Sequence, residues 1–411
     1  MGVHSLTAVL RRYAPQSLKT KRTHAFSNQV IAFDASCHLN KFIYGEEVRP
    51  HRHVYGFYLM ARYCQLHNIT PIFVFDGAYR IAAKQLEHSR REKSRRKIQP
   101  SLDYERARSV RLASWTNAYR DLSDDAATRI LEQLLTTTPP TRSAISYPSK
   151  ETTPMTKAKT TMNESDTDRA KKVDDEVIEK QLVQLATDLN DALELAEDTE
   201  KYTRTVRGLS AREHAVMTSM IRDRIEDTDT ALQDLQNDNQ QMMSSLEKRS
   251  IRITQALRQE CLEFLRTLGF ICMTCEHHEA EAMCSELARQ NITTATVTED
   301  MDALVFGDAP ILRYFFARNR PILEIDPVIA REQLHLTRDQ FIDFCILSGT
   351  DFSGTIQGIG PIRALEYIQR YGSIEHILDD LSNTKYSPSD TFNYKLAREV
   401  RKTIHTNIHR Y

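Results

Sequence analysis

Short apolar runs alternate with helical patterns near both ends of the chain. Residues 29–35 and 71–77 are continuous apolar runs, and residues 293–300 form a third, rich in threonine and valine. Between the first two runs, residues 53–67 carry apolar side chains at three- and four-residue spacing, which predicts a helix. Continuous apolar strands alternating with helices predict an α/β fold whose mostly parallel central sheet is covered on both faces.

Each predicted strand ends on an aspartate: Asp34, Asp76 and Asp300. In parallel sheets, ligands bind beyond the carboxyl ends of the strands. One aspartate in such a position is common by chance, but three of them, each after a buried run, indicate a site.

Two glutamates, Glu279 and Glu281, open a helical pattern shortly before the third strand. Residues two apart do not share a face of a regular helix, so we expect both at its irregular first turn, where free N–H groups favour carboxylates. On an extended segment, Asp300 and Asp302 would project to the same side.

A further carboxylate, Asp351, lies in the turn-rich stretch LSGTDFSG after a helical pattern at 338–347. So many carboxylates cannot share one cleft unless cations offset their repulsion. All-oxygen ligands select Mg²⁺ or Mn²⁺ over zinc.

The middle third of the chain differs in composition. Residues 135–172 are rich in Ser, Thr, Pro and Lys, which is typical of a disordered linker. Amphipathic patterns over 178–193 and from about 211 to 253 predict two helices that pair as an antiparallel, coiled-coil-like hairpin. Their apolar stripes either pack on each other and the core or bind a protein partner.

Composition and charge narrow the class of protein. Hydrophobic residues make up 40% of the chain, no stretch resembles a 20-residue apolar span, and we expect a soluble protein without a membrane partner. Residues 1–100 hold 17 Lys and Arg against 6 Asp and Glu, so they form either a phosphate-facing surface or an ordinary solvated face.

Seven scattered cysteines indicate a reducing compartment. Cys272 and Cys275, followed by His277 and His278, could form part of a structural zinc site, but no second ligand pair has zinc-site spacing. Buried thiols are the better interpretation.

Seven motifs, in this order, resemble the flap endonuclease/XPG-type 5′ nuclease family: MGVHSL, VIAFDAS, PIFVFDG, HEAEAMC, TEDMDAL, LSGTDF and GIGPIRAL. The resemblance implies a PIN-like nuclease domain, a helix–hairpin–helix element and a long helical insertion in the gateway region over the active site. Its parts would be 1–99, the insertion 100–259, 260–335 and 336–411.

The resemblance also implies a two-metal site made of seven carboxylates. Glu279, Glu281, Asp300 and Asp302 would hold the ion nearer the nucleophile, Asp34 and Asp76 the shared face, and Asp351 the second ion. The family's two basic gateway positions, which contact the scissile phosphate, fall on Arg90 and on Ala83, whose neighbour is Lys84.

DNA contacts are implied at several further positions. The family's base-stacking position falls on Asn40, with His38 close by, and the helix–hairpin–helix element would bind duplex DNA with a K⁺ ion held by Thr355, Ile356 and Ile359. The residues expected to contact DNA are Gly2, Asn40, Arg90, Arg91, Gly358, Gly360 and Arg363.

The activity implied is hydrolysis of phosphodiester bonds at DNA flaps, branches or nicks. Three alternatives remain at this point: a 5′-to-3′ exodeoxyribonuclease of the same family, a non-catalytic DNA-junction scaffold, and an RNA-directed nuclease of a related fold. The basic segment 84–97 and the implied repair role favour the nucleus, with the mitochondrion left open. No sliding-clamp motif is visible near Tyr411.

Overall fold

The chain folds into two compact units. In the computed structural model, one unit comprises Met1–Glu92 with Arg252–Tyr411 and the other Lys93–Ile251, so the inserted unit begins and ends about eight residues earlier than the predicted 100–259. The structure describes residues 3, 5–45, 47, 49–77, 84–118, 124–135, 166–223, 228–276, 278–381 and 386–402.

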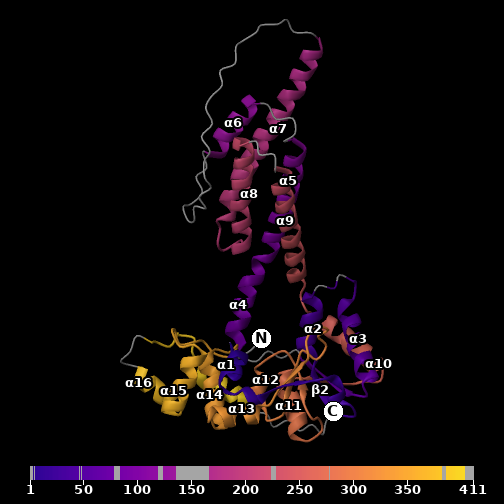
Figure 1. The fold of residues 1–411 in the computed structure, drawn as a ribbon, viewed down its shortest axis with the longest axis vertical. Helices are drawn as coiled ribbons and strands as arrows, with labels where there is room; N and C mark the ends of the chain where they lie inside the picture. The colour runs from indigo at the N-terminus through magenta and orange to yellow at the C-terminus, as the bar shows by residue number, and fades with distance from the viewer. Residues whose placement is uncertain are drawn as a thin grey trace. The chain divides into compact units, whose positions relative to one another are not determined.

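The larger unit is built on one sheet with the strand order β1-β7-β6-β5-β2-β3-β4 (Figure 1). The five strands from β6 to β4 pair in parallel, and β7 and β1 pair antiparallel at one edge. The predicted α/β fold with a mostly parallel central sheet is confirmed. The strands are β1 (Leu18–Lys21), β2 (Val30–Asp34), β3 (Thr70–Asp76), β4 (Ile271–Cys275), β5 (Thr296–Val297), β6 (Ile311–Arg313) and β7 (Ile322–Ile325).

The central strands β2 and β3 are buried on both faces, as their continuous apolar sequences predict. On one face, Ala32 and Val74 pack in a cluster with Met283 of the helix α11 (Ala280–Arg289). On the other face, Phe33 and Phe73 lie in an aromatic cluster with ring centroids 5.5 Å apart.

The helices α2 (Ala35–Tyr44) and α3 (Arg52–Leu66) follow β2, and α10 (Gln255–Thr267) precedes β4. Phe57 of α3 packs edge-on against Phe73, with ring centroids 6.0 Å apart. The aromatic face of the sheet is therefore covered by α3.

A second core lies at the C-terminal side of this unit, where helices before and after the sheet pack together. A capping box at Thr337 and Gln340 starts α14 and satisfies two free N–H groups. The helices are α1 (Leu6–Tyr13), α12 (Ala303–Phe306), α13 (Pro327–Leu334), α14 (Arg338–Ser348), α15 (Pro361–Tyr371), α16 (Ile374–Leu381) and α17 (Tyr394–Lys402).

The inserted unit is a helical bundle rather than the predicted two-helix hairpin. The second predicted helix is divided into α8 and α9, and α5 and α6 complete the bundle within the described residues (Figure 1). The two predicted segments thus correspond to three of the helices, and apolar periodicity does not show which helix packs on which. The helices are α5 (Ile98–Ala118), α6 (Asp124–Leu135), α7 (Asp166–Ala196), α8 (Arg204–Asp223) and α9 (Thr228–Ser250), and the unit boundary falls within α4 (Gln85–Arg96).

The predicted linker at 135–172 is only partly described. Residues 136–165 lie outside the described residues, and from Asp166 the chain is already helical in α7. Among the residues that the structure describes, no helix is long and apolar enough to cross a membrane.

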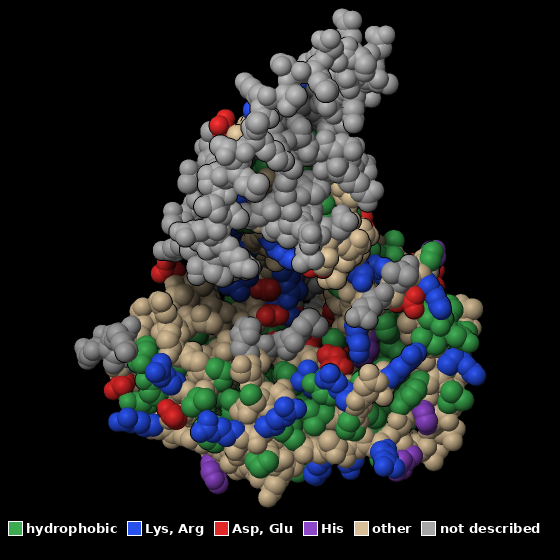
Figure 2. Space-filling model, turned by 45° about the horizontal axis from the view of Figure 1, so that its top comes forward, with side chains coloured by type: hydrophobic (Ala, Val, Ile, Leu, Met, Phe, Trp, Pro, Cys, Tyr) green, Lys and Arg blue, Asp and Glu red, His purple; other side chains and the backbone are tan. Residues whose placement is uncertain are grey.

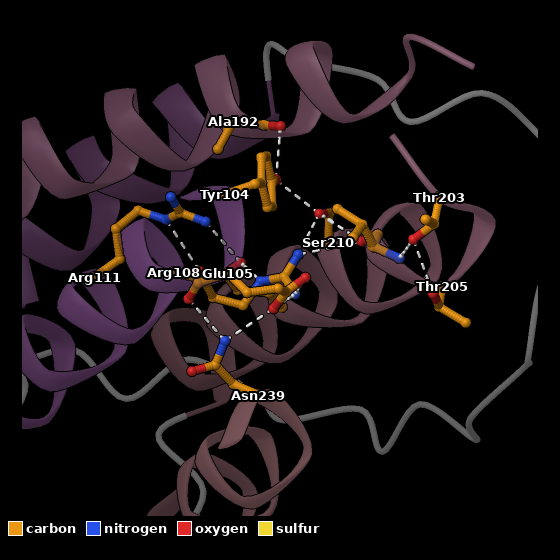
Figure 3. Close-up of polar contacts among 11 residues, drawn as sticks. Tyr104, Glu105, Arg108, Arg111, Ala192, Thr203, Thr205, Ser210 and Asn239 are labelled. Atoms are coloured by element: carbon orange, nitrogen blue, oxygen red, sulfur yellow. Dashed lines mark hydrogen bonds and ion pairs between the residues drawn. The ribbon is translucent and has the colours of Figure 1, made fainter. Parts of the chain in front are cut away.

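A buried polar network joins three helices of the inserted unit (Figure 3). Arg108 of α5 donates to Glu213 of α8 (2.8 Å) and to Glu105 (2.6 Å), and Arg111 also donates to Glu213 (3.1 Å). Asn239 of α9 donates to Glu105 at 2.8 Å. Arg108, Glu105 and Glu213 are fully buried, so each charge depends on its partners in this network.

Replacing Glu213 by Ala should destabilise the inserted unit by about 3–5 kcal/mol, because two arginines lose their buried carboxylate. Urea unfolding followed by Trp115 fluorescence measures this, because Trp115 is the one tryptophan of the sequence and is buried in that unit. The matched control is Asp238→Ala, which breaks an exposed pair with Arg212 and should cost about 1 kcal/mol or less. Equal losses in both variants would contradict a structural role for the network.

Candidate metal centre

The carboxyl edge of the central strands gathers the predicted acidic side chains. Asp34 ends β2 and caps α2, Asp76 ends β3, and Glu279 occupies the N-cap position of α11. Glu281 lies in the first turn of α11, as its spacing from Glu279 predicts. Asp34 and Glu281 are buried.

Hydrogen bonds hold the two strand-end aspartates in place. Asp34 accepts from Thr298 Oγ1 (2.8 Å) and from the backbone N–H of Cys37 (2.9 Å). Asp76 Oδ1 accepts from the backbone N–H of Ala280 at 2.8 Å, which joins the end of β3 to the start of α11. Thr298 is a supporting residue that the sequence analysis missed, because nothing in its local pattern marks a contact with a residue 264 positions away.

The prediction that Asp300 and Asp302 lie on an extended segment is wrong. The strand β5 ends at Val297, and Asp302 has helical backbone angles at the N-cap of α12. Its backbone N–H donates to Asp300 Oδ1 at 3.1 Å. A tight turn thus holds both buried carboxylates, because the chain must reverse there to enter α12.

Three acidic residues of the site have raised pKa values. Burial and the charge of Asp76 raise the pKa of Asp34 to about 7, although hydrogen bonds from Cys37 and Thr298 oppose the shift. Burial raises the pKa of Glu279 to about 7 against the opposing charge of Lys84. Burial and Glu279 raise the pKa of Glu281 well above its usual range.

Lys84 is the cation that the described residues bring into this cluster. Its ammonium forms a close ion pair with Glu279 and lies 4.7 Å from the ring centroid of Phe352. Burial alone would lower the pKa of Lys84, but the carboxylates of Glu279, Glu281 and Asp302 outweigh it and raise that pKa. Lys84 is therefore the lysine that the structure places among the acidic residues.

The residues fit hard divalent cations. Carboxylates predominate among the side chains that converge, and burial together with neighbouring carboxylates raises the pKa values of Asp34, Glu279 and Glu281. Glu279 Oε2 is buried and has no hydrogen-bond partner among the described residues, so an oxygen is left for a cation. Such a donor set suits Mg²⁺ or Mn²⁺.

The basic residues of α4 differ in their contacts. Arg91 Nη2 donates to Asp351 Oδ2 at 3.1 Å and also pairs with Glu87. Arg90 pairs with Glu87 at 3.6 Å, and its side chain is 85% exposed. Arg91 thus reaches a predicted metal ligand, and Arg90 faces solvent.

The predicted base-stacking position falls on Asn40, whose side chain is not aromatic. Asn40 is exposed on α2 and donates to Ser36 O at 2.8 Å. His38 is buried and bonds to Asp34 O at 2.7 Å, and burial lowers its pKa to about 4. His38 is therefore a core residue, and Gly2 lies outside the described residues.

The helix–hairpin–helix element forms a tight turn before α15. Gly358 has a φ of 84°, and a Cβ there would lie 2.8 Å from the ring of Tyr386, so glycine is required on two grounds. Arg363 is exposed and donates to Gly358 O at 2.6 Å. Gly360 caps α15 and lies in open space.

Two of the predicted K⁺ ligands already accept hydrogen bonds. Thr355 O accepts from Ser389 N (3.2 Å), and Ile356 O accepts from Ile359 N (3.1 Å). Ile356 and Ile359 are buried, and Thr355 is exposed. A K⁺ ion at this turn stays a prediction.

The structural-zinc alternative finds no support in the described residues. Cys272 and Cys275 lie on β4 and join no cluster of three ligands there, and His277 is outside the described part of the chain. Burial raises the pKa of Cys272 to about 11 and also raises that of Cys275.

Replacing Asp34 by Asn should stabilise the metal-free protein at pH 8, by up to about 4 kcal/mol, because one repelling charge disappears. Burial and the charge of Asp76 raise the pKa of Asp34 from its usual range to about 7, so at pH values in between the folded state binds more protons than the unfolded state. The stability of the wild type should therefore fall as pH rises from about 4 to 7, and the variant should escape that part of the loss.

Thermal unfolding in a chelator at several pH values measures this difference. Asp308→Asn, at an exposed aspartate paired with Arg331, serves as control and should not gain stability. A destabilised Asp34→Asn variant at pH 8 would show that its hydrogen bonds outweigh the repulsion.

Comparisons with known proteins agree with this arrangement. The XPG N-terminal domain matches residues 1–98, and the XPG I-region matches residues 273–351. Flap endonuclease 1 of Chlamydomonas reinhardtii is 41% identical over 167 residues, which is 40% of this chain and 42% of that protein. Flap endonuclease 1 of Caenorhabditis briggsae is 40% identical over 157 residues, 38% of this chain and 41% of that protein.

The chain spans about two fifths of the length of these curated relatives. Among solved structures, the catalytic core of Rad2 in complex with DNA substrate aligns with a TM-score of 0.49 and 16% identity, over 93% of this chain and 72% of that one. Flap endonuclease-1 from Methanococcus jannaschii aligns with a TM-score of 0.46 and 15% identity, over 97% and 96%.

The two matched regions contain all seven predicted metal carboxylates, together with Lys84 and Arg90. The resemblance that the motifs indicated is thereby confirmed for these two regions, which match the XPG N-terminal domain and the XPG I-region.

Proposed function

We propose that this protein is a metal-dependent, structure-specific 5′ nuclease that hydrolyses phosphodiester bonds at flaps, branches or nicks in DNA. The observation that carries the proposal is the convergence of buried and half-buried carboxylates from β2, β3, α11 and α12 at one edge of the sheet. The similarity of both halves of the nuclease unit to flap endonuclease 1 supports DNA as the substrate.

Two Mg²⁺ or Mn²⁺ ions bound here would activate a water molecule and stabilise both the attacking and the leaving oxygen of an in-line displacement at phosphorus. Asp34 and Asp76, held by Thr298 Oγ1 and by backbone N–H groups, would present fixed oxygens to the shared side of the site. Glu281, Asp300 and Asp302 are buried, so their oxygens would bind cations in a partly dehydrated environment. Electrostatic attraction between opposite charges is stronger there than in water.

Lys84 would act on the substrate once cations are bound. Its ammonium pairs with Glu279, a predicted metal ligand, so divalent cations and Lys84 compete for the same carboxylate. Once displaced from Glu279, the charged ammonium of Lys84 would contact a phosphate oxygen of the scissile nucleotide. Arg91 would be released from Asp351 in the same way.

DNA would be bound mainly through phosphates. Exposed basic residues recur in the N-terminal region, and Lys and Arg side chains are spread over the visible face in Figure 2. The turn at Gly358 and Gly360 opens α15, whose first N–H groups would face a phosphate, with Arg363 beside them. Such contacts carry little sequence information and weaken with salt. A K⁺ ion at Thr355, Ile356 and Ile359 would support this element.

A substrate panel tests the proposal. The full chain, with Mg²⁺, should cut an end-labelled 5′ flap near the single-strand/duplex junction, and Asp300→Asn should slow cleavage more than about 100-fold. Asp308→Asn, outside the carboxylate cluster, should cleave like the wild type. Preferential cutting of a matched RNA flap, release of mononucleotides from blunt ends alone, or tight junction binding without cleavage would each overturn it.

Replacing Lys84 by Ala should slow cleavage about 100-fold at saturating Mg²⁺, yet tighten Mg²⁺ binding to the DNA-free protein, because Glu279 loses its competitor. Isothermal titration and single-turnover cleavage measure the two effects separately. Lys19→Ala, at an exposed lysine of β1, is the matched control and should change neither. Weaker Mg²⁺ binding in Lys84→Ala would contradict the competition.

A further inference from the structure

Three side chains with metal-ligand chemistry meet on the larger unit, at the start of α3 and on α10. His51 Nδ1 lies 2.9 Å from Glu260 Oε1, and His53 Nε2 lies 2.9 Å from Glu260 Oε2. One ligand atom from each residue lies within 4.8 Å of the other two. None of the three belongs to the carboxylate cluster or to the motifs of the nuclease family.

The backbone at the start of α3 makes this convergence possible. Residues two apart on a regular helix point to different sides. His51 instead has φ 52° and ψ 32° at the N-cap, a left-handed conformation that non-glycine residues seldom adopt, and His53 lies in the first turn. Strained backbone of this kind is concentrated at functional sites.

Burial differs across the cluster in a way that suits an ion at its edge. The His53 side chain is 7% exposed, whereas His51 is 72% and Glu260 41% exposed. The two imidazoles lie with ring centroids 5.9 Å apart. One ligand would therefore be fixed in the protein, and the solvent side would remain open for a water ligand.

The types of ligand atom indicate which class of metal ion would bind. Zn²⁺ binds such a set of two imidazole nitrogens, one carboxylate oxygen and one water molecule, at distances of about 2.0–2.2 Å. Neighbouring ligand atoms in a tetrahedral shell of that size are ~3.3 Å apart. Each imidazole nitrogen lies 2.9 Å from a different oxygen of Glu260, and one ligand atom from each residue lies within 4.8 Å of the other two, so side-chain rotations would bring the three around one ion. Nitrogen ligands disfavour Mg²⁺, so this site and the carboxylate cluster would select different ions.

We propose that His51, His53 and Glu260 form a second metal site, which binds Zn²⁺ or a similar borderline transition-metal ion and joins α3 to α10. The joined residues are more than 200 positions apart in the sequence, on either side of the inserted unit. The helix α10 also reaches the strand end beside Asp76, because Arg258 donates to Gly77 O at 3.5 Å. A bound ion thus stabilises the first helix after the insertion against the nuclease core.

The test is thermal unfolding of the full chain with saturating Mg²⁺, with and without equimolar Zn²⁺. Mg²⁺ occupies the carboxylate cluster, so added Zn²⁺ should raise Tm by about 2–4 °C or more through the histidine site. Glu260→Gln keeps a hydrogen-bonding amide but loses the anionic ligand, and it should lose the shift, as should His53→Gln. His24→Asn, at an exposed histidine elsewhere on this unit, should keep it.

A spectroscopic readout tests coordination directly. Equimolar Co²⁺ added to the Asp300→Asn background, which weakens the carboxylate cluster, should give the intense visible absorption of a four-coordinate ion with nitrogen ligands. The additional Glu260→Gln change should abolish that absorption. An unchanged Zn²⁺ shift in Glu260→Gln, or only the weak spectrum of six-coordinate Co²⁺, would show that the three residues merely hydrogen-bond.

Discussion

Repulsion among buried carboxylates at the carboxyl edge of the sheet is the constraint on which the nuclease unit depends. The parallel pairing of β2 with β3 and of β2 with β5 brings the ends of these strands to one edge, and the start of α11 meets them there. Burial, and after it the neighbouring carboxylates, raise the pKa values of Asp34, Glu279 and Glu281, so both disfavour the charged forms. Rigid apolar layers on both faces of the sheet hold the charges in place.

Three kinds of interaction offset the repulsion in the metal-free protein. Backbone N–H groups and Thr298 donate to the aspartates, Lys84 pairs with Glu279, and Arg91 pairs with Asp351. The two cations come from the segment directly before the inserted unit, whereas the carboxylates come from the sheet and its helices. Under the proposed function, divalent cations would replace these side-chain cations at the carboxylates.

The same arrangement of two residues at a helix start occurs at α11 and at α3. Glu279 and Glu281, and likewise His51 and His53, are pairs two residues apart that converge because one member caps a helix and the other lies in its first turn. Carboxylates at the first pair suit hard ions, and imidazoles at the second suit a borderline ion. The inserted unit, in contrast, depends on an internal charge network around Arg108 and on its own apolar core.

The sequence by itself determined the features that are encoded locally. Apolar runs predicted β2 and β3, the two-residue spacing placed Glu279 and Glu281 at a helix start, and aspartates after buried runs marked the edge of the sheet. Only the tertiary structure decided the turn at Asp302, the contact of Thr298 with Asp34, the position of Lys84 and the five-helix bundle. These features depend on contacts between residues far apart in the chain, and the period of a local pattern reveals the buried face of a segment but not the segment that covers it.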